Sequence, residues 1–129
     1  MTKAYDVVKS HYDASDRGDL DGMLAPISPQ ARWTEAEGFP CAGTYVGPGA
    51  IRDNVFVALG RLFDGFTFTL DTLLDAGSHA VGVGSYSATS KATGKSFNAR
   101  VVHLWTVEDG KVVRFEQFAD TAIVARAMR

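Results

Sequence analysis

The chain has 129 residues, of which 46% are hydrophobic and 22% are charged, and its formal net charge at pH 7 is −2. This length and composition fit one globular domain with a sizeable core and leave little room for a second domain. The slightly acidic balance offers no basic surface for nucleic acid or for an anionic membrane.

Cys41 is the only cysteine, which excludes an internal disulfide and fits a reducing compartment. The N-terminal segment MTKAYD lacks the apolar stretch of a signal peptide, and no part of the chain reaches membrane-spanning length. We therefore expect residues 1–129 to form one soluble, cytoplasmic domain that binds neither nucleic acid nor membranes.

Two helices are expected first. Residues 3–15 have apolar positions at helical spacing, and Gly18 is suited to follow the helix end. Asp19 can cap a short second helix over residues 20–27. The inward stripe of the first helix consists of Ala4, Val7, Val8, His11 and Ser15.

The segment ARWTEAE (31–37) alternates as a strand does, with Trp33, Glu35 and Glu37 on one face. The Gly- and Pro-rich segment that follows reads as a loop. Pro48 suits the first turn of a third helix. Its predicted buried stripe is Ile51, Val55, Leu59 and Leu62.

Strand signals dominate from Gly65 onward. Alternating segments at 66–70, 80–90, 96–107 and 111–118 are separated by turns rich in Gly, Asp and Lys. A short helix over residues 121–128 closes the chain. Helices followed by consecutive hairpins predict an α+β fold with one antiparallel sheet.

The turn VEDGK sets the register of the last hairpin. A two-residue turn at Asp109-Gly110 would place Arg114 and Glu116 on the face of His103. A longer turn with Gly110 as a left-handed bulge would instead place Val113, Phe115, Gln117 and Ala119 there. Because charges are costly on an apolar face, we expect the bulged turn.

Four segments resemble the SnoaL-like polyketide cyclase and ketosteroid isomerase-related branch of the nuclear transport factor 2-like superfamily: RGDLDGML, ARWTEAEGFP, AGTYVGPGAIRDNVF and HLWTVEDGKVVRFEQFADT. The resemblance implies a cone-shaped, cystatin-like fold: a curved antiparallel sheet, wrapped by the N-terminal helices, that encloses an apolar pocket. It also implies a homodimer formed through the convex face of the sheet, where Val102 and Leu104 are expected.

The resemblance also implies site residues. Ketosteroid isomerase uses an Asp base, with a Tyr and a protonated Asp as oxyanion donors. Glu35 stands at the position of the base. His11, with Tyr12 beside it, stands at the position of the Tyr, and His103 at that of the protonated Asp. In SnoaL cyclases an Asp near the end of the last strand transfers the proton, and Asp120 lies in that region.

The residues themselves leave simpler interpretations open. Glu35 beside Trp33 in a dry pocket should have a raised pKa, but it could instead be solvated at the strand end. His103 and His11 could be packed core residues. Asp120 could simply cap the last helix. The side chains expected to contact a ligand are Tyr12, Trp33, Trp105, Phe115 and Gln117.

No metal site and no cofactor are expected, because the three histidines lack ligand spacing and the glycine-rich segments lack phosphate-loop context. We expect a small-molecule-binding protein whose ligand is small, apolar, and cyclic or carbonyl-bearing. The candidate activity is a cofactor-independent isomerase, cyclase, lyase or hydrolase that uses acid–base chemistry. The alternative is a non-catalytic ligand-binding or dimerisation module of the same fold.

Overall fold

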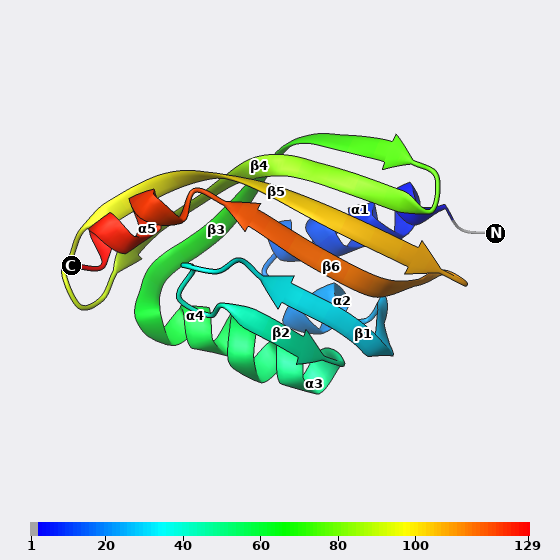
Figure 1. Cartoon of the computed structure of the whole chain (residues 1–129), viewed down its shortest axis with the longest axis horizontal. Coiled ribbons are helices and arrows are strands. Elements are labelled where there is room, and N and C mark those ends of the chain that lie inside the picture. The colour runs from blue at the N-terminus through cyan, green and yellow to red at the C-terminus, as the bar shows by residue number, and fades with distance from the viewer. Residues whose placement is uncertain (1–2) are drawn as a thin grey trace.

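A computed structural model describes residues 3–129 and shows an α+β fold in which helices pack on a long, curved sheet (Figure 1). The helices are α1 (Ala4–Asp16), α2 (Leu20–Leu24), α3 (Pro48–Ile51), the π-helix η1 (Arg52–Phe56), α4 (Val57–Leu62) and α5 (Thr121–Ala127). The strands are β1 (Ile27–Glu35), β2 (Gly43–Val46), β3 (Phe63–Ala76), β4 (His79–Ser90), β5 (Ser96–Glu108) and β6 (Lys111–Ala119). The predicted fold class is confirmed.

The six strands are ordered β2-β1-β6-β5-β4-β3. Four of the pairs are antiparallel, but β1 and β6 run parallel, so the sheet is mixed where we expected purely antiparallel pairing. The reason is topological: the chain passes through four further strands, β2 to β5, between β1 and β6 and returns beside β1 in the same direction. Strand β2 is a second correction, because the Gly- and Pro-rich loop contains it.

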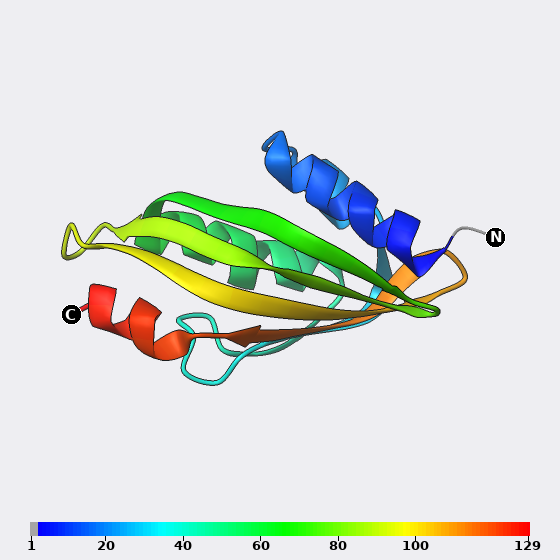
Figure 2. The same cartoon turned by 90° about the horizontal axis from the view of Figure 1, so that it is seen from above.

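Helix α1 lies over one face of the sheet, and the start of α1 and the end of α5 lie at opposite ends of the molecule (Figure 2). The helix contacts β3, β4, β5 and β6. Val7, Val8 and His11 of the predicted inward stripe are buried, whereas Ser15 is only partly buried and Tyr12, outside that stripe, is buried as well. The core therefore lies between α1, the α3–α4 segment and the inner face of the sheet. No helix in residues 3–129 has the length and apolar character to cross a membrane.

The third helix departs from its predicted stripe at one position. Ile51, Val55 and Leu59 are buried, but Leu62 is 37% exposed. The middle turn, η1, is a π-helix that holds more residues than an α-helical turn, so the inward positions that follow it are shifted toward the C-terminus. Leu62 is the last residue of α4, and the next residue, Phe63 at the start of β3, is buried instead. Glu37, expected on the inner face of β1, lies beyond the strand and is exposed.

The last hairpin has the predicted faces but not the predicted turn. Asp109 and Gly110 both have positive φ, as a two-residue type I′ turn requires. The register then shifts between Thr106 and Val107, and Val113 is the extra residue on β6. This bulge restores the expected alternation, so that His103 pairs with Gln117 and Trp105 with Phe115. Val113 was predicted on the inner face, but Val112 is buried there instead.

Candidate functional site

Three strands place polar side chains on the buried face of the sheet. Glu35 ends β1, His103 lies in the middle of β5, and Gln117 lies directly opposite His103 on β6. Their side chains are almost fully buried, as are those of Tyr12 on α1 and Tyr86 on β4. Buried polar groups are costly unless they are hydrogen-bonded, so each of them needs partners inside the core.

His103 lies between two tyrosines. Its Nδ1 is 2.7 Å from the hydroxyl of Tyr12, and its Nε2 is 2.6 Å from the hydroxyl of Tyr86. Each tyrosine oxygen also accepts a hydrogen bond from a donor-only group: Trp105 Nε1 donates to Tyr12 at 2.9 Å, and Gln117 Nε2 donates to Tyr86 at 2.9 Å. The result is a continuous buried chain of hydrogen bonds from Trp105 to Gln117.

Glu35 lies next to Gln117, at one end of this chain of hydrogen bonds. Its carboxylate accepts hydrogen bonds from Gln117 Nε2 (3.3 Å), Trp33 Nε1 (3.2 Å) and Cys41 Sγ (3.3 Å). The orientation of the Gln117 amide is fixed by the backbone N–H of Ala36, which donates to Gln117 Oε1 at 2.9 Å. The amide nitrogen must therefore point toward Glu35 and Tyr86.

Burial changes the protonation of these groups. It raises the pKa of Glu35 from its ordinary value of 4.5 to about 7, against the opposing effect of its hydrogen bonds from Cys41 and Trp33. It lowers the pKa of His103 to about 3 and that of His11 to about 4, so both imidazoles are neutral at physiological pH. It raises the pKa of Tyr12 and of Tyr86 above the ordinary value of 10. Glu35 is the group in this network that can exchange a proton near pH 7.

Glu35 and His103 belong to one network but do not touch. Gln117 and Tyr86 stand between them and connect them by hydrogen bonds. The core thus brings the two candidates together through packed polar side chains. A hollow of about 670 Å³ lies elsewhere, between Lys3 at the start of α1 and the hairpin turns at Gly77 and Gly110.

Helix α1 presents Tyr12 to His103 in place of His11. Nδ1 of His11 is 2.8 Å from the backbone carbonyl of Met23, so His11 ties α1 to α2. The His11 ring also packs near Trp105, with ring centroids 4.7 Å apart. His11 therefore takes the position of a packed core residue, one of the two interpretations that the sequence left open.

Asp120 lies outside the network. Its side chain is exposed and accepts a hydrogen bond from the backbone N–H of Ile123, which makes it the N-cap of α5. This is the simpler of the two interpretations that the sequence allowed.

The aromatic residues expected to contact a ligand form one packed group. Trp33 and Phe115 stack with ring centroids 3.7 Å apart, and Trp105 contacts both at 5.4 and 4.6 Å. All three are almost fully buried. They form an apolar wall next to Glu35 and His103.

The sequence analysis missed two members of the network. Neither Tyr86 nor Cys41 is among the site residues predicted from the sequence. Gly82, four positions before Tyr86 and on the same face of β4, carries a signal: a Cβ at Gly82 would lie on the Tyr12 hydroxyl. A glycine on an inward strand position can mark the close approach of another group.

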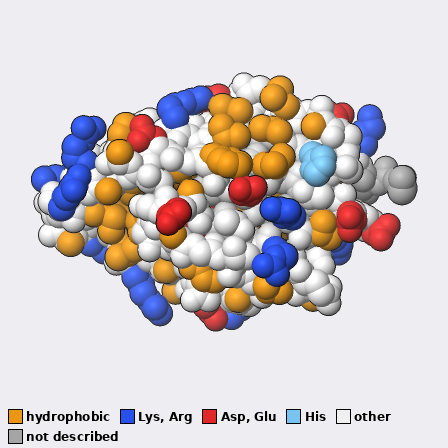
Figure 3. Space-filling view, viewed as in Figure 1, with side chains coloured by type: hydrophobic (Ala, Val, Ile, Leu, Met, Phe, Trp, Pro, Cys, Tyr) orange, Lys and Arg blue, Asp and Glu red, His pale blue; other side chains and the backbone are white. Residues whose placement is uncertain are grey.

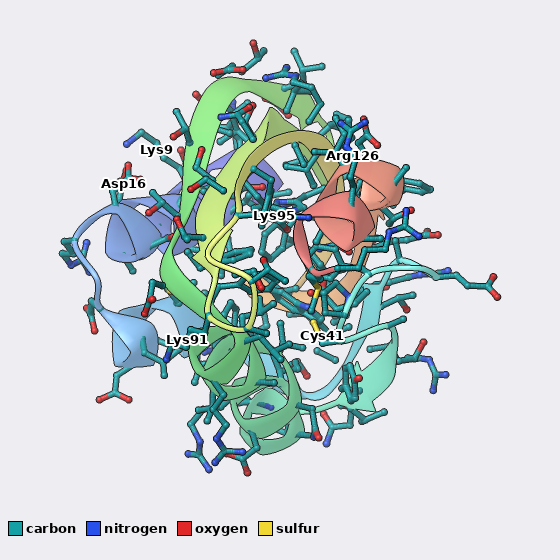
Figure 4. The ribbon with its side chains drawn as sticks, turned by 90° about the vertical axis from the view of Figure 1, so that its left-hand side faces the viewer. Lys9, Asp16, Cys41, Lys91, Lys95 and Arg126 are labelled. Atoms are coloured by element: carbon teal, nitrogen blue, oxygen red, sulfur yellow. The ribbon has the colours of Figure 1, made fainter. Side chains whose placement is uncertain are left out.

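The loop that carries Cys41 covers Glu35. Cys41 is buried, and burial and the charge of Glu35 raise the pKa of its thiol, which remains a donor. Figure 4 shows Cys41 inside the space enclosed by the ribbon, whereas Lys9 and Asp16 lie at the outer edge. Phe39 of the same loop packs against Tyr86, with ring centroids 5.7 Å apart.

Residues 8–115 match the SnoaL-like domain family model. The chain belongs to this family. Patulin synthesis protein F of Aspergillus clavatus is 32% identical to this SnoaL-like chain over 93 residues. That stretch covers 67% of this chain but only 44% of the fungal protein, so the chain spans less than half the length of that relative.

Two solved structures extend the comparison. The crystal structure of an NTF2-like protein from Burkholderia thailandensis is 54% identical, has a TM-score of 0.98 and aligns over 100% of this chain and 99% of its own. TerC, co-crystallised with polyporic acid, is 24% identical, with a TM-score of 0.83 over 95% of each chain, which shows a shared fold. The predicted family and fold are both confirmed, and a small-molecule-binding or cyclase function fits the SnoaL-like family.

Proposed function

We propose that this SnoaL-like protein binds a small, largely apolar, carbonyl-bearing or cyclic metabolite and moves a proton on it without a cofactor. The proposal depends on one observation: Glu35 is a buried carboxylate with a pKa of about 7, and a single amide separates it from a hydrogen-bonded Tyr-His-Tyr chain. A proton-transfer group is most effective when its pKa lies near the working pH. A neutral donor chain beside it can stabilise the negative charge that develops on a carbonyl oxygen.

The roles follow from the geometry. Glu35, in its ionised form, takes a proton from the carbon next to the carbonyl group and can return it elsewhere on the ligand. His103 and its tyrosine partners provide the hydrogen-bond donors to the ligand oxygen. The imidazole can be neutral in this role, and a neutral imidazole needs no counter-ion in an apolar site. Trp33, Trp105 and Phe115 provide the apolar wall. We assign Asp120 to capping α5 and His11 to anchoring α1.

The comparisons support a small-molecule ligand. The fungal relative is named for patulin synthesis, and TerC was crystallised with polyporic acid. In this chain the network side chains are at most 6% exposed, so a ligand must displace side chains to enter. Phe39 packs on Tyr86 from the loop between β1 and β2 that also covers Glu35, and we place the entry route there.

Exchange of carbon-bound hydrogen tests the proton transfer without knowledge of the natural substrate. A panel of cyclic ketones, such as 2-tetralone and 2-indanone, is incubated with the protein in D₂O, and deuterium uptake next to the carbonyl is followed by mass spectrometry. We expect catalysed uptake by the wild-type protein and a loss of about 10²–10⁴-fold in Glu35→Gln. Glu37→Gln, which alters an exposed carboxylate two positions away, is the control and should leave the rate unchanged.

A non-catalytic binding module is the second candidate. It is favoured by the packing of Gln117 and Tyr86 between Glu35 and His103. Binding of polyporic acid, with no deuterium uptake on any ketone of the panel, would support this alternative over the enzyme.

We also propose a homodimer through the convex face of the sheet. An outer apolar patch, defined as Val81, Val83, Val102, Leu104 and Phe118, occupies neighbouring outward positions on β4, β5 and β6. Figure 3 shows apolar side chains gathered over β4 and β5 on this face. A contiguous apolar patch of this kind is typical of a protein interface. A reducing, cytoplasmic location fits the unpaired Cys41.

A further inference from the structure

The hydrogen-bond chain through His103 contains one hydroxyl proton more than its internal bonds use. The chain of hydrogen bonds ends at the indole N–H of Trp105 and the amide NH₂ of Gln117, groups that can only donate. Each of them donates to a tyrosine oxygen. Between these ends lie Tyr12, His103 and Tyr86, which carry three protons in total when the imidazole is neutral. The two internal hydrogen bonds consume two of them.

The remaining proton must belong to one of the two hydroxyls. If His103 carries its proton on Nδ1, it donates to Tyr12, and the hydroxyl proton of Tyr12 is free. If His103 carries its proton on Nε2, it donates to Tyr86, and the hydroxyl proton of Tyr86 is free. The tautomer of one imidazole therefore decides which tyrosine can donate to a ligand.

The surroundings of the two hydroxyls differ. The Tyr12 oxygen lies against the backbone of Gly82, where even a methyl group would collide with it. The Tyr86 oxygen and a Glu35 oxygen are both bonded to the same Gln117 nitrogen, at 2.9 and 3.3 Å. The nearby carboxylate of Glu35 favours an orientation in which the hydroxyl hydrogen of Tyr86 points toward it.

We propose that His103 holds the Nε2–H tautomer and that Tyr86 donates its free hydroxyl proton to the ligand oxygen. In this arrangement each N–H or O–H from Trp105 through Tyr12 and His103 to Tyr86 points in the same direction, toward Glu35. Such head-to-tail chains strengthen each successive bond. The assignment of the ligand oxygen to Tyr86 deepens the proposed function and rests on it, whereas the tautomer does not.

The same geometry defines the ligand's chemistry. An oxygen that accepts from Tyr86 lies on the Glu35 side of the network, so the atom that loses a proton to Glu35 should be close to that oxygen. Phe39, Phe66 and Phe68 surround the Tyr86 ring, with centroid separations of 5.7, 4.9 and 5.7 Å. The site therefore suits an aromatic or unsaturated ring that bears a carbonyl, enol or phenolic oxygen.

The tautomer is measured directly by NMR of the wild-type protein labelled with ¹⁵N-histidine, with His103→Gln used to assign the signals. We expect a protonated Nε2 and a bare Nδ1 for His103 at neutral pH. A protonated Nδ1 would mean that the free hydroxyl proton belongs to Tyr12, and it would overturn the inference. This measurement requires neither substrate nor activity.

The donor is tested with 4-nitrophenol, whose yellow phenolate form reports the bound oxyanion. We expect Tyr86→Phe to weaken binding about ten- to a hundredfold, as expected when a hydrogen bond to a charged group is lost. Tyr12→Phe should change it less than about threefold, and Tyr5→Phe, outside the network, should leave it unchanged. Equal losses for Tyr12→Phe and Tyr86→Phe, or no binding by the wild type, would contradict the role of Tyr86.

The outcomes separate the two proposals. Tyr86-dependent binding of 4-nitrophenol without deuterium uptake on any ketone would remove the catalytic function and leave the assignment of Tyr86 in place. Deuterium uptake that depends on Glu35 but survives Tyr86→Phe undiminished would support the catalytic function and remove the assignment of Tyr86.

Discussion

The hydroxyl of Tyr12 and Nδ1 of His103 lie 2.7 Å apart, although 91 positions separate the two residues in the sequence. This contact joins the first helix to the middle of β5 through a buried polar bond. Their rings are also nearly parallel, with centroids 5.9 Å apart and an interplanar angle of 10°. Because a hydrogen bond depends on direction as well as distance, it fixes the rotation of α1 about its own axis, which apolar packing alone specifies less strictly.

Gly82→Ala tests how closely this contact is packed. The added methyl group would occupy the position of the Tyr12 hydroxyl, so we expect a loss of at least about 2 kcal/mol in the free energy of unfolding. Urea denaturation measures it. Gly60→Ala is the control, because a Cβ at this position in α4 meets nothing within 4 Å, and it should raise stability by about 0.5–1 kcal/mol. A Gly82→Ala protein as stable as the wild type would refute the close approach.

Glu35→Gln should change how stability depends on pH. The pKa of Glu35 is raised to about 7 in the folded protein, so the folded state holds a proton that the unfolded state loses above about 4.5. This contribution to stability is complete below the unfolded pKa and is lost as pH rises through the folded pKa. The wild type should therefore lose about 3 kcal/mol relative to Glu35→Gln between pH 4.5 and pH 7.

Denaturation of both proteins at several pH values gives this difference. His11 and His103 have lowered pKa values, and their contribution rises with pH up to about 6.5 in both proteins. It therefore cancels in the comparison. A difference that does not vary with pH would mean that Glu35 has an ordinary pKa.

Cys41 should react slowly with iodoacetamide in the native protein. Its side chain is buried, and its thiol, whose pKa is raised, donates to Glu35. Since the thiolate is the reactive form, we expect modification at least about a hundredfold slower than in urea, as followed by mass spectrometry. The chain contains no second cysteine, so one mass shift reports this site alone. Equal rates in both conditions would show that the loop between β1 and β2 leaves the site open.

Phe118→Glu should convert the proposed dimer to a monomer. Phe118 is 50% exposed and belongs to the outer apolar patch, so a carboxylate there would be buried against the partner copy. Val46→Glu is the control, because Val46 is equally exposed, at 51%, but lies on the edge strand β2. Sedimentation velocity distinguishes the two states. Dissociation by Val46→Glu and not by Phe118→Glu would move the interface to the sheet edge.

Most of the fold could be predicted because its hydrophobic periodicity is strong. Alternation over β4, β5 and β6 identified their inward faces, and burial correctly favoured Phe115 and Gln117 beside His103. The turn could not be predicted in the same way. Burial constrains only which residues face inward, and a type I′ turn with a bulge at Val113 gives the same faces as the longer turn.

The site was predictable where it follows strand alternation and uncertain where it follows helix rotation. Glu35 and His103 lie on alternating strand faces, whose direction the pattern determines. Adjacent helical positions differ by about 100° in direction, and His11 and Tyr12 both face the core. Only the position of His103 decides between them. Tyr86 was missed because an inward aromatic residue on a strand has the same pattern whether or not its hydroxyl is bonded.

The bulge at Val113 makes the length of the last hairpin a determinant of the chemistry. Regular pairing of the same residues from the two-residue turn, without the bulge, would set Trp105 opposite Arg114 and His103 opposite Glu116 and would rotate Phe115 and Gln117 toward solvent. Glu35 and Tyr86 would then lose the amide that connects them. A family member that has the same turn but no bulge should therefore have one residue fewer between the turn and the position of Phe115 if it keeps these side chains inward.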